Sequence, residues 1–343
     1  KSHPMHAATG ELVASAIIKA AEDTGIPNGV FSNLNSSGVE VGQSLVMHPG
    51  IKAVGFTGSI KGGMALYKMA SEREEPIPVF AEMGSINPVV IFPSALNEKG
   101  DFWAKQYAGS ITLGAGQFCT NPGLILGMEG AALDKFITLL GHEIEIIEPS
   151  CMLHPNILKG YSEGTDHLSK QEGTKVVGYY KKEVAPNYAQ QKVITVKGAQ
   201  FSANPTLHRE VFGPFSLIVK CKDKRELRNI LDHLEGQLTG SVLGNREELE
   251  QNHEIIEALT NRVGRIIFNG VPTGVEVCPS MQHGGPFPAS SDSRFTSVGV
   301  SAIKRWARPV AFQDWPNELL PEALKDTNPL GITRLLNGKH TNN

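Results

Sequence analysis

Cysteine is scarce in this sequence, positive charge is not in excess, and long apolar runs are missing. Of the 343 residues, 20% are charged, and the formal net charge is −3. This balance gives no strongly basic surface, so we expect no nucleic-acid partner. No apolar stretch reaches the length of a membrane-spanning helix, and residues 1–6 lack the apolar core of a signal peptide. We therefore expect no membrane partner.

The few cysteines also exclude some kinds of site. Cys119, Cys151, Cys221 and Cys278 form no C-x-x-C pair, and this spacing predicts neither a zinc knuckle nor a redox dithiol. The His-Glu pairs in the chain are not followed by the second histidine of a metalloprotease motif, so we predict no metal. A chain of this size needs no disulfides to fold, so a reducing, cytoplasmic location is expected.

Predicted helices and strands alternate along the chain. Residues 7–24 carry one apolar helical stripe, formed by Leu12, Val13, Ala16, Ile17, Ala20 and Ala21. Strands are expected at 30–34 and 51–56, and a further helix at 60–72. This alternation predicts an α/β fold with a parallel, doubly wound sheet.

A glycine-containing turn joins the second of these strands to its helix. It places Gly58, Ser59 and Gly63 at the start of the helix, where backbone N–H groups and the helix dipole suit a phosphate. The spacing is G-x-x-x-x-G rather than the dinucleotide fingerprint, so a turn without a ligand is the alternative.

One cysteine lies on a loop of small residues. Cys119 follows Gly114-Ala115-Gly116 and precedes Asn121-Pro122-Gly123, after an amphipathic segment at 101–113 that we expect to be helical. Small neighbours let a carbonyl substrate approach the sulfur, and local dipoles favour a nucleophilic thiolate. A buried, inert thiol is the alternative, but such a thiol does not need the glycines around it.

Two further side chains are candidates for the same chemistry. Glu82 ends an apolar strand, close to Gly84, and burial there would raise its pKa and suit it to act as a general base. A surface turn residue is the alternative. Residues 269–300 form a loop rich in Gly, Pro and Ser. Within it, Arg294 is a candidate anchor for an anionic substrate, with a surface ion pair as the alternative.

Five motifs taken together resemble those of the aldehyde dehydrogenase family. They are Phe56-Thr57-Gly58-Ser59, Glu82-Met83-Gly84, Gly116-Gln117-Phe118-Cys119, Glu210-Val211-Phe212-Gly213-Pro214 and Phe268-Asn269. Residues 272–277 and the segment His283-Gly284-Gly285-Pro286 resemble one branch of that family. Members of this branch oxidise α-ketoglutaric semialdehyde or, with NADP, fatty aldehydes.

The resemblance implies an aldehyde dehydrogenase-like α/β fold, with a Rossmann-type cofactor domain beside an α/β catalytic domain. It implies that Cys119 attacks the aldehyde carbon, that hydride leaves to the nicotinamide, and that Glu82 activates the water that hydrolyses the thioester. The residues implied to bind the cofactor are Lys1, Phe56, Thr57, Gly58, Ser59, Gly63, Glu210 and Phe212.

The residues near the start of the chain bear on the choice of cofactor. Lys1 matches the family's lysine at the adenosine ribose, and Pro4 stands where NAD-preferring members often carry a glutamate. The missing carboxylate removes repulsion against a 2′-phosphate, and Lys1 adds positive charge. We therefore expect NADP, with NAD as the alternative.

The family has a long segment before the position of Lys1 that this sequence does not contain. That segment supplies strands of the cofactor domain and an oxyanion-hole asparagine, a donor worth about 3 kcal/mol of transition-state stabilisation. We therefore expect the sequence to begin inside a longer protein. The expected parts are a partial dinucleotide-binding domain at 1–83, a catalytic domain at 84–305 and a C-terminal tail at 306–343.

The resemblance favours oxidation of α-ketoglutaric semialdehyde to 2-oxoglutarate, with a fatty aldehyde as the alternative substrate. Acyl transfer to coenzyme A is disfavoured, because that reaction needs no water-activating Glu82. A catalytically silent fragment with a binding role is a third hypothesis. The missing segment favours it, and the presence of Cys119, Glu82 and Glu210 disfavours it. The family's habit implies a homodimer or homotetramer.

Overall fold

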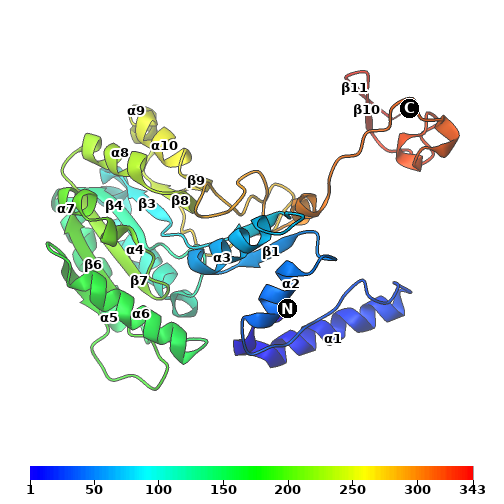
Figure 1. Cartoon of the computed structure of the whole chain (residues 1–343). Helices are drawn as coiled ribbons and strands as arrows, with labels where there is room; N and C mark the ends of the chain where they lie inside the picture. The colour runs from blue at the N-terminus through cyan, green and yellow to red at the C-terminus, as the bar shows by residue number, and fades with distance from the viewer. Residues whose placement is uncertain (343) are drawn as a thin grey trace. The chain divides into compact units, whose positions relative to one another are not determined.

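The computed structural model describes residues 1–342. The chain divides into two compact units, Lys1–Ala302 and Ile303–Asn343. The first unit contains a two-stranded and a seven-stranded sheet, and Figure 1 shows the seven-stranded sheet with helices packed on it. The predicted boundary between residues 83 and 84 lies in the connection between the two sheets, and it stays a prediction.

Helices and strands alternate through most of the first unit. Its α-helices are α1 (Ala7–Asp23), α2 (Glu40–Met47), α3 (Ile60–Ser71), α4 (Pro93–Thr112), α5 (Ala131–Ile146), α6 (Pro155–Ser169), α7 (Gly198–Ala203), α8 (Lys224–His233), α9 (Arg246–Gln251) and α10 (His253–Thr260). Its strands are β1 (Val54–Thr57), β2 (Val79–Glu82), β3 (Pro88–Ile91), β4 (Leu124–Met128), β5 (Lys175–Tyr179), β6 (Lys192–Lys197), β7 (Phe215–Cys221), β8 (Gln237–Leu243) and β9 (Val263–Phe268). Short 3-10 helices are η1 (Pro4–His6), η2 (Leu113–Gly116) and η3 (Pro205–His208), and η4 (Val300–Trp306) contains the boundary between the two units.

The seven-stranded sheet has the order β5-β6-β7-β4-β3-β8-β9. All of its neighbouring strands run parallel except the β5–β6 pair. Parallel strands need crossover connections, and helices supply them here. The prediction of a parallel, doubly wound α/β sheet is confirmed.

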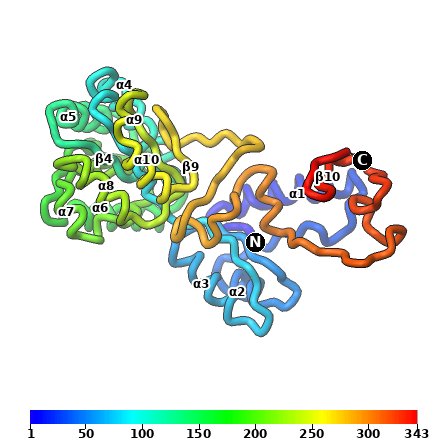
Figure 2. Tube along the Cα trace, turned by 90° about the horizontal axis from the view of Figure 1, so that it is seen from above, coloured from blue at the N-terminus to red at the C-terminus, as the bar shows by residue number. Residues whose placement is uncertain are grey.

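Side chains alternate across this sheet and fill a core on each face. Val89 and Ile91 of β3 pack with α4 and α5 on one face. Val90 and Phe92, the neighbouring residues, pack with α6, α7, α8 and α10 on the other face. A strand buried on both sides reads as a continuous apolar run, as residues 89–92 do. Figure 2 shows this part of the chain gathered into one body.

The smaller sheet pairs β1 with β2 in parallel, α3 packs against β2, and α2 packs against α3. Its core is small and includes Val46, Ala70, Val79 and Met83. The predicted helix at 7–24 is confirmed as α1, but its only buried residue is Ala14. The prediction of a strand at 30–34 is wrong, because these residues form no regular pairing.

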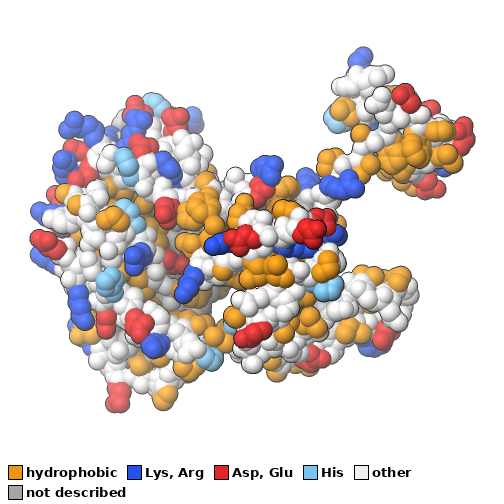
Figure 3. All heavy atoms as spheres, viewed as in Figure 1, with side chains coloured by type: hydrophobic (Ala, Val, Ile, Leu, Met, Phe, Trp, Pro, Cys, Tyr) orange, Lys and Arg blue, Asp and Glu red, His pale blue; other side chains and the backbone are white. Residues whose placement is uncertain are grey.

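The second unit contains η5 (Asn317–Leu319), η6 (Glu322–Leu324) and an antiparallel hairpin of β10 (Arg334–Leu336) with β11 (Lys339–Thr341). Large apolar side chains lie exposed on it, among them Trp315, Leu319 and Leu335, and Figure 3 shows the apolar atoms on its surface. Across residues 1–342, no helix combines the length and apolar content that crossing a bilayer requires.

Candidate active site

The loop that carries Cys119 is shaped by residues in the left-handed backbone region. After α4 ends, Gly114, Ala115 and Gly116 have φ of 57°, 56° and 65°, a region that favours glycine. A Cβ on Gly116 would overlap the backbone of Gly213. The cysteine loop therefore packs directly on the 210–214 segment, and two of the sequence motifs meet there.

A buried asparagine fixes the other side of this loop. Asn87 Nδ2 donates to the carbonyl oxygens of Cys119 at 2.9 Å and Asn121 at 2.8 Å. Its Oδ1 accepts from the hydroxyls of Ser85 at 2.9 Å and Thr239 at 3.0 Å. Asn87 is 1% exposed, so water does not compete for these bonds. This clamp was not predicted from the sequence.

Three side chains from distant parts of the chain meet beside this loop. The Sγ of Cys119 lies 3.3 Å from Nε2 of His283. The same nitrogen lies 3.1 Å from Oε1 of Glu82. The side chains of His283 and Glu82 are each 5% exposed, whereas Cys119 is half-buried. The sulfur is thus the member of this cluster that a substrate can reach.

The pKa values of Glu82 and His283 move in opposite directions. Burial raises the pKa of Glu82, but the hydrogen bonds from His283 and Ser297 outweigh it, so the pKa lies below its usual value. Burial lowers the pKa of His283, but the hydrogen bonds to Cys119 and Glu82 outweigh it and raise the pKa to about 9. The expectation that burial raises the pKa of Glu82 is therefore wrong, because its hydrogen-bond donors more than compensate for the loss of water.

His283 and Glu82 are held by the loop at 282–298. The backbone N–H of His283 donates to Thr296 Oγ1 at 2.9 Å, and the hydroxyl of Ser297 donates to Oε2 of Glu82. His283 Nδ1 is buried and has no partner among residues 1–342. The sequence marked His283 only as part of a family motif. His283 lies 164 residues from Cys119 along the chain, so sequence spacing did not indicate that the two side chains are in contact.

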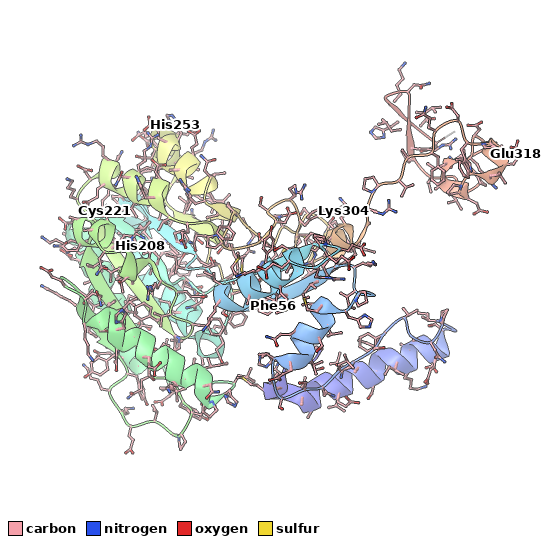
Figure 4. All side chains as sticks on the ribbon, in the orientation of Figure 1. Phe56, His208, Cys221, His253, Lys304 and Glu318 are labelled. Atoms are coloured by element: carbon pink, nitrogen blue, oxygen red, sulfur yellow. The ribbon has the colours of Figure 1, made fainter. Side chains whose placement is uncertain are left out.

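The other cysteines differ from Cys119. Cys221 is fully buried at the end of β7 (labelled in Figure 4), and burial raises the pKa of its thiol to about 12. Cys151 is exposed, and Cys278 is half-buried with its sulfur 3.3 Å from the Ser280 hydroxyl. Among the described residues, only Cys119 has a histidine ring nitrogen within hydrogen-bond distance of its sulfur.

The start of α3 matches the predicted phosphate-binding turn in its geometry. Ser59 is the N-cap, and its Oγ accepts from the backbone N–H of Gly62 at 3.2 Å. Side chains on Gly58 or Gly62 would strike the ring of Phe56, which lies beside α3 (Figure 4). The N–H of Gly62 is thus occupied by the cap, whereas the N–H groups of Ile60 and Lys61 have no partner among the described residues and remain free for an anion.

Gly63 and Thr57 have structural partners of their own. Gly63 is buried, and a Cβ there would strike Met83 and Ala81. It therefore lets α3 lie close on β2. Thr57 pairs with Glu82 in the β1–β2 register. Their contact with a cofactor stays a prediction.

The carboxylate of Glu210 lies beside Gly84, two residues after the end of β2. Its carboxylate occupies the space where Gly84 would carry a Cβ, and Ser85 N–H donates to it at 3.4 Å. Desolvation by the surrounding protein raises the pKa of Glu210 to about 7, although the residue keeps much of its surface open to water. Phe212, two residues on, is exposed. Lys1 is also exposed, and its Nζ donates to the Ser2 carbonyl at 3.0 Å.

A family model described as "Aldehyde dehydrogenase family" matches residues 6–291. The chain belongs to the aldehyde dehydrogenase family. It is 47% identical to the α-ketoglutaric semialdehyde dehydrogenase of Acinetobacter baylyi over 100% of the chain and 65% of that protein. It is 46% identical to α-ketoglutaric semialdehyde dehydrogenase 2 of Azospirillum brasilense over 99% of the chain and 65% of that protein. The chain thus spans just under two thirds of the length of these aldehyde dehydrogenases.

Solved aldehyde dehydrogenases share the fold at low identity. The γ-glutamyl-γ-aminobutyraldehyde dehydrogenase of Burkholderia cenocepacia superposes with a TM-score of 0.70 at 21% identity, over 85% of this chain and 58% of that one. The aldehyde dehydrogenase KauB of Pseudomonas aeruginosa gives a TM-score of 0.72 at 22% identity, over 85% of this chain and 58% of that one. The predicted aldehyde dehydrogenase-like fold is confirmed.

The structure does not support Arg294 as a substrate anchor. Its guanidinium donates to both oxygens of Asp292, at 2.9 and 2.6 Å, and its side chain is 78% exposed. Its charge is therefore already neutralised at the surface, which is the ion pair weighed as the alternative. No hydrogen bond or ion pair within residues 1–342 joins it to Cys119, Glu82 or His283.

The cluster has a donor set that a metal ion also accepts. One ligand atom each of Glu82, Cys119 and His283 lies within 4.8 Å of the others. The absence of a metal stays a prediction. The hydrogen bonds already account for the arrangement, because a thiol, an imidazole and a carboxylate at these distances form a proton-transfer group without an ion.

Proposed function

We propose that this protein oxidises an aldehyde to a carboxylic acid through a thioester on Cys119. The observation that supports this most is the contact of His283 Nε2 with both the Cys119 sulfur and the Glu82 carboxylate. A nucleophile with a base beside it, and a third group orienting that base, is the arrangement expected for covalent catalysis. Membership of the aldehyde dehydrogenase family supports the same reaction.

Cys119 attacks the aldehyde carbon in the first step. The raised pKa of His283 keeps a positive charge beside the sulfur at neutral pH, which favours the thiolate. The backbone N–H of Cys119 has no partner among the described residues, and it supplies one donor to the developing oxyanion. When bound, NAD(P)⁺ accepts the hydride that leaves the resulting adduct.

Glu82 then serves the hydrolysis of the thioester. Its carboxylate is ionised and held at one oxygen by His283 and at the other by Ser297. An ionised carboxylate at hydrogen-bond reach of a water takes the water's proton as that water attacks the thioester carbon. The N-terminal turn of α3 and Glu210 are the groups that would hold the cofactor, on its pyrophosphate and nicotinamide ribose respectively.

The proposed substrate is α-ketoglutaric semialdehyde, and the proposed product is 2-oxoglutarate. This proposal rests on two relatives, at 47% and 46% identity, that are named as α-ketoglutaric semialdehyde dehydrogenases. A fatty aldehyde is the weaker alternative, since the long-chain-aldehyde dehydrogenase of an Acinetobacter species is 29% identical over only 58% of this chain. Initial rates of the intact natural protein on α-ketoglutaric semialdehyde and on dodecanal separate the two.

Two substitutions test the mechanism in the intact natural protein. Cys119→Ala removes the nucleophile, so aldehyde oxidation falls by about 10⁴-fold or more. Glu82→Gln keeps the first step but removes the base, so a stopped-flow trace shows one equivalent of reduced cofactor per site followed by a stall. Cys221→Ala is the matched control at a buried thiol. Unchanged steady-state turnover in either test variant contradicts the assigned step.

We also propose that NADP is preferred over NAD. The carboxylate that would repel a 2′-phosphate is replaced by Pro4, and the exposed Lys1 supplies a positive charge. Lys1→Met is expected to raise the KM for NADP about tenfold and to change the KM for NAD little. Faster initial rates with NAD than with NADP at equal concentration refute the preference.

The remaining proposals concern the cell and the assembly. Four free cysteines fit a reducing, cytoplasmic location. Exposed apolar residues on the 303–343 unit, including Trp315, Leu319 and Leu335, fit a homodimer or homotetramer. Light scattering after size exclusion measures the assembly, and a monomer at micromolar concentration contradicts it.

A further inference from the structure

We propose that Arg265 is the anchor for the carboxylate of the substrate, at the end opposite the aldehyde. This inference rests on the proposed function and narrows it to aldehydes that carry a negative charge. Arg265 thus has the role, anchoring an anionic substrate, that the sequence analysis considered for Arg294. The grounds are the unused donors of its guanidinium, its missing acidic partner and its position beside the cysteine loop.

The guanidinium of Arg265 has N–H donors that no protein group accepts among the described residues. It is half-buried on β9, and one Nη2 hydrogen bond reaches the Pro272 carbonyl at 3.0 Å. Its Nε is buried and has no partner among residues 1–342. No carboxylate among those residues lies within ion-pair distance of it, in contrast to Arg228, Arg246 and Arg294. A half-buried cation without a counter-ion is partly desolvated, and an anion that binds it offsets that cost.

Two chains of contact connect the β9 backbone at Arg265 to the active site. Gly264, the preceding residue, lies so close to Gly284 that a Cβ would overlap the Gly284 carbonyl, and Gly284 follows His283. On the other side, Arg265 pairs in register with Thr239 of β8. Thr239 donates to the Asn87 side chain, which holds the Cys119 carbonyl.

The guanidinium is also held in a fixed orientation. The Pro272 carbonyl that accepts from it belongs to a loop anchored on α4, the helix that leads to the cysteine loop. Ser110 and Thr273 join their hydroxyls at 2.6 Å, and the Tyr107 hydroxyl donates to the Gly270 carbonyl at 2.9 Å. Because the bond to Pro272 holds one end of the planar guanidinium, its remaining N–H groups keep a fixed direction. A fixed, planar set of donors suits a carboxylate.

The charge of this arginine acts at the reacting sulfur as well. Burial lowers the pKa of Arg265, and the charge of Cys119 partly opposes this. The two groups are thus close enough to interact electrostatically. An aldehyde with a terminal carboxylate supplies this cation with a counter-ion, whereas a long alkyl aldehyde leaves the cation without one.

Substrate kinetics of the intact natural protein test the anchor. Arg265→Gln is expected to lower kcat/KM for α-ketoglutaric semialdehyde and succinic semialdehyde about 100-fold, mostly through KM. For butanal, which has no carboxylate, the change is expected to stay within about threefold. Arg265→Lys keeps the charge without the fork and is expected to fall between the two. Arg246→Gln, at an exposed ion pair, is the matched control. An equal loss with both classes of aldehyde, or a loss with Arg294→Gln instead, overturns the proposal.

A second measurement needs no turnover. Iodoacetate and iodoacetamide both alkylate Cys119, and only the first carries a carboxylate. The ratio of their rate constants, followed by mass spectrometry, is expected to fall about tenfold in Arg265→Gln. An unchanged ratio in a folded variant overturns the anchor, and an equal slowing of both reagents assigns Arg265 to the thiolate instead. If the wild-type protein oxidises no aldehyde, the proposed function fails, while this ratio still reports on the anion site.

Discussion

Residues 1–83 and residues 84–302 are both built from alternating helices and strands, but they bury very different amounts of apolar surface. In the second region, α5 buries Leu133, Phe136 and Leu140 against a seven-stranded sheet. In the first, α1 has an equally clear apolar stripe, yet Leu12 stays 74% exposed. Amphipathic spacing therefore specifies a helix and its apolar face, whereas burial depends on whether partner strands are present.

The largest difference in the free energy of unfolding is expected between the truncation of a buried and of an exposed apolar side chain. Phe201 is fully buried in the second region and stacks on His208 at 4.3 Å. Phe201→Ala in the 1–343 chain is expected to lower the free energy of unfolding by about 3–5 kcal/mol. Leu12→Ala is the matched substitution on α1 and is expected to change it by less than about 0.5 kcal/mol. Urea denaturation measures both. A cost of several kcal/mol at Leu12 would mean that another surface covers α1.

For a pair of glycine substitutions, one in each region, a smaller difference in the free energy of unfolding is expected. Gly116→Ala would drive a Cβ into the Gly213 backbone at a φ of 65°, so a loss of about 3 kcal/mol and of Cys119 alkylation is expected. Gly63→Ala meets the flexible Met83 side chain at 2.6 Å, which can move, so a loss of about 1 kcal/mol is expected. Equal losses would show that the cysteine loop is no more rigid than the contact of α3 with β2 at Gly63.

The third expected contrast depends on pH and concerns the site alone. The folded-state pKa of His283 is about 9, against 6.5 for the ordinary group. A raised pKa stabilises the fold below pH 6.5, and this contribution is lost as the pH rises through 9. Relative to wild type, His283→Gln is expected to cost about 2–3 kcal/mol at pH 6 and much less at pH 9.5. Denaturation at both pH values checks this. A difference that grows with pH would contradict the charged histidine.

The sequence predicts the parts of the site that are local. The glycines around Cys119, the strand end at Glu82 and the turn at Gly58-Ser59 each act within a few residues, so their spacing indicates the backbone they form. The doubly wound fold follows from the same alternation.

The parts that sequence reasoning missed depend on long-range contacts. His283 lies 164 residues from Cys119 along the chain, yet their side chains touch. The direction of the Glu82 pKa shift was wrong for the same reason, since its donors lie more than 200 residues away. Arg294 was considered as a substrate anchor because of its positive charge. In the structure, however, Asp292, only two residues away, neutralises that charge.

The single nitrogen that faces both sulfur and carboxylate sets an order on events at the site. That nitrogen has one N–H to donate, so it cannot bond fully to Sγ of Cys119 and to Oε1 of Glu82 at the same time. In the proposed reaction, a sulfur bonded to the substrate carbon no longer competes for this N–H. The proposed mechanism therefore implies that His283 pairs first with the sulfur, for the attack, and then with Glu82, for the hydrolysis.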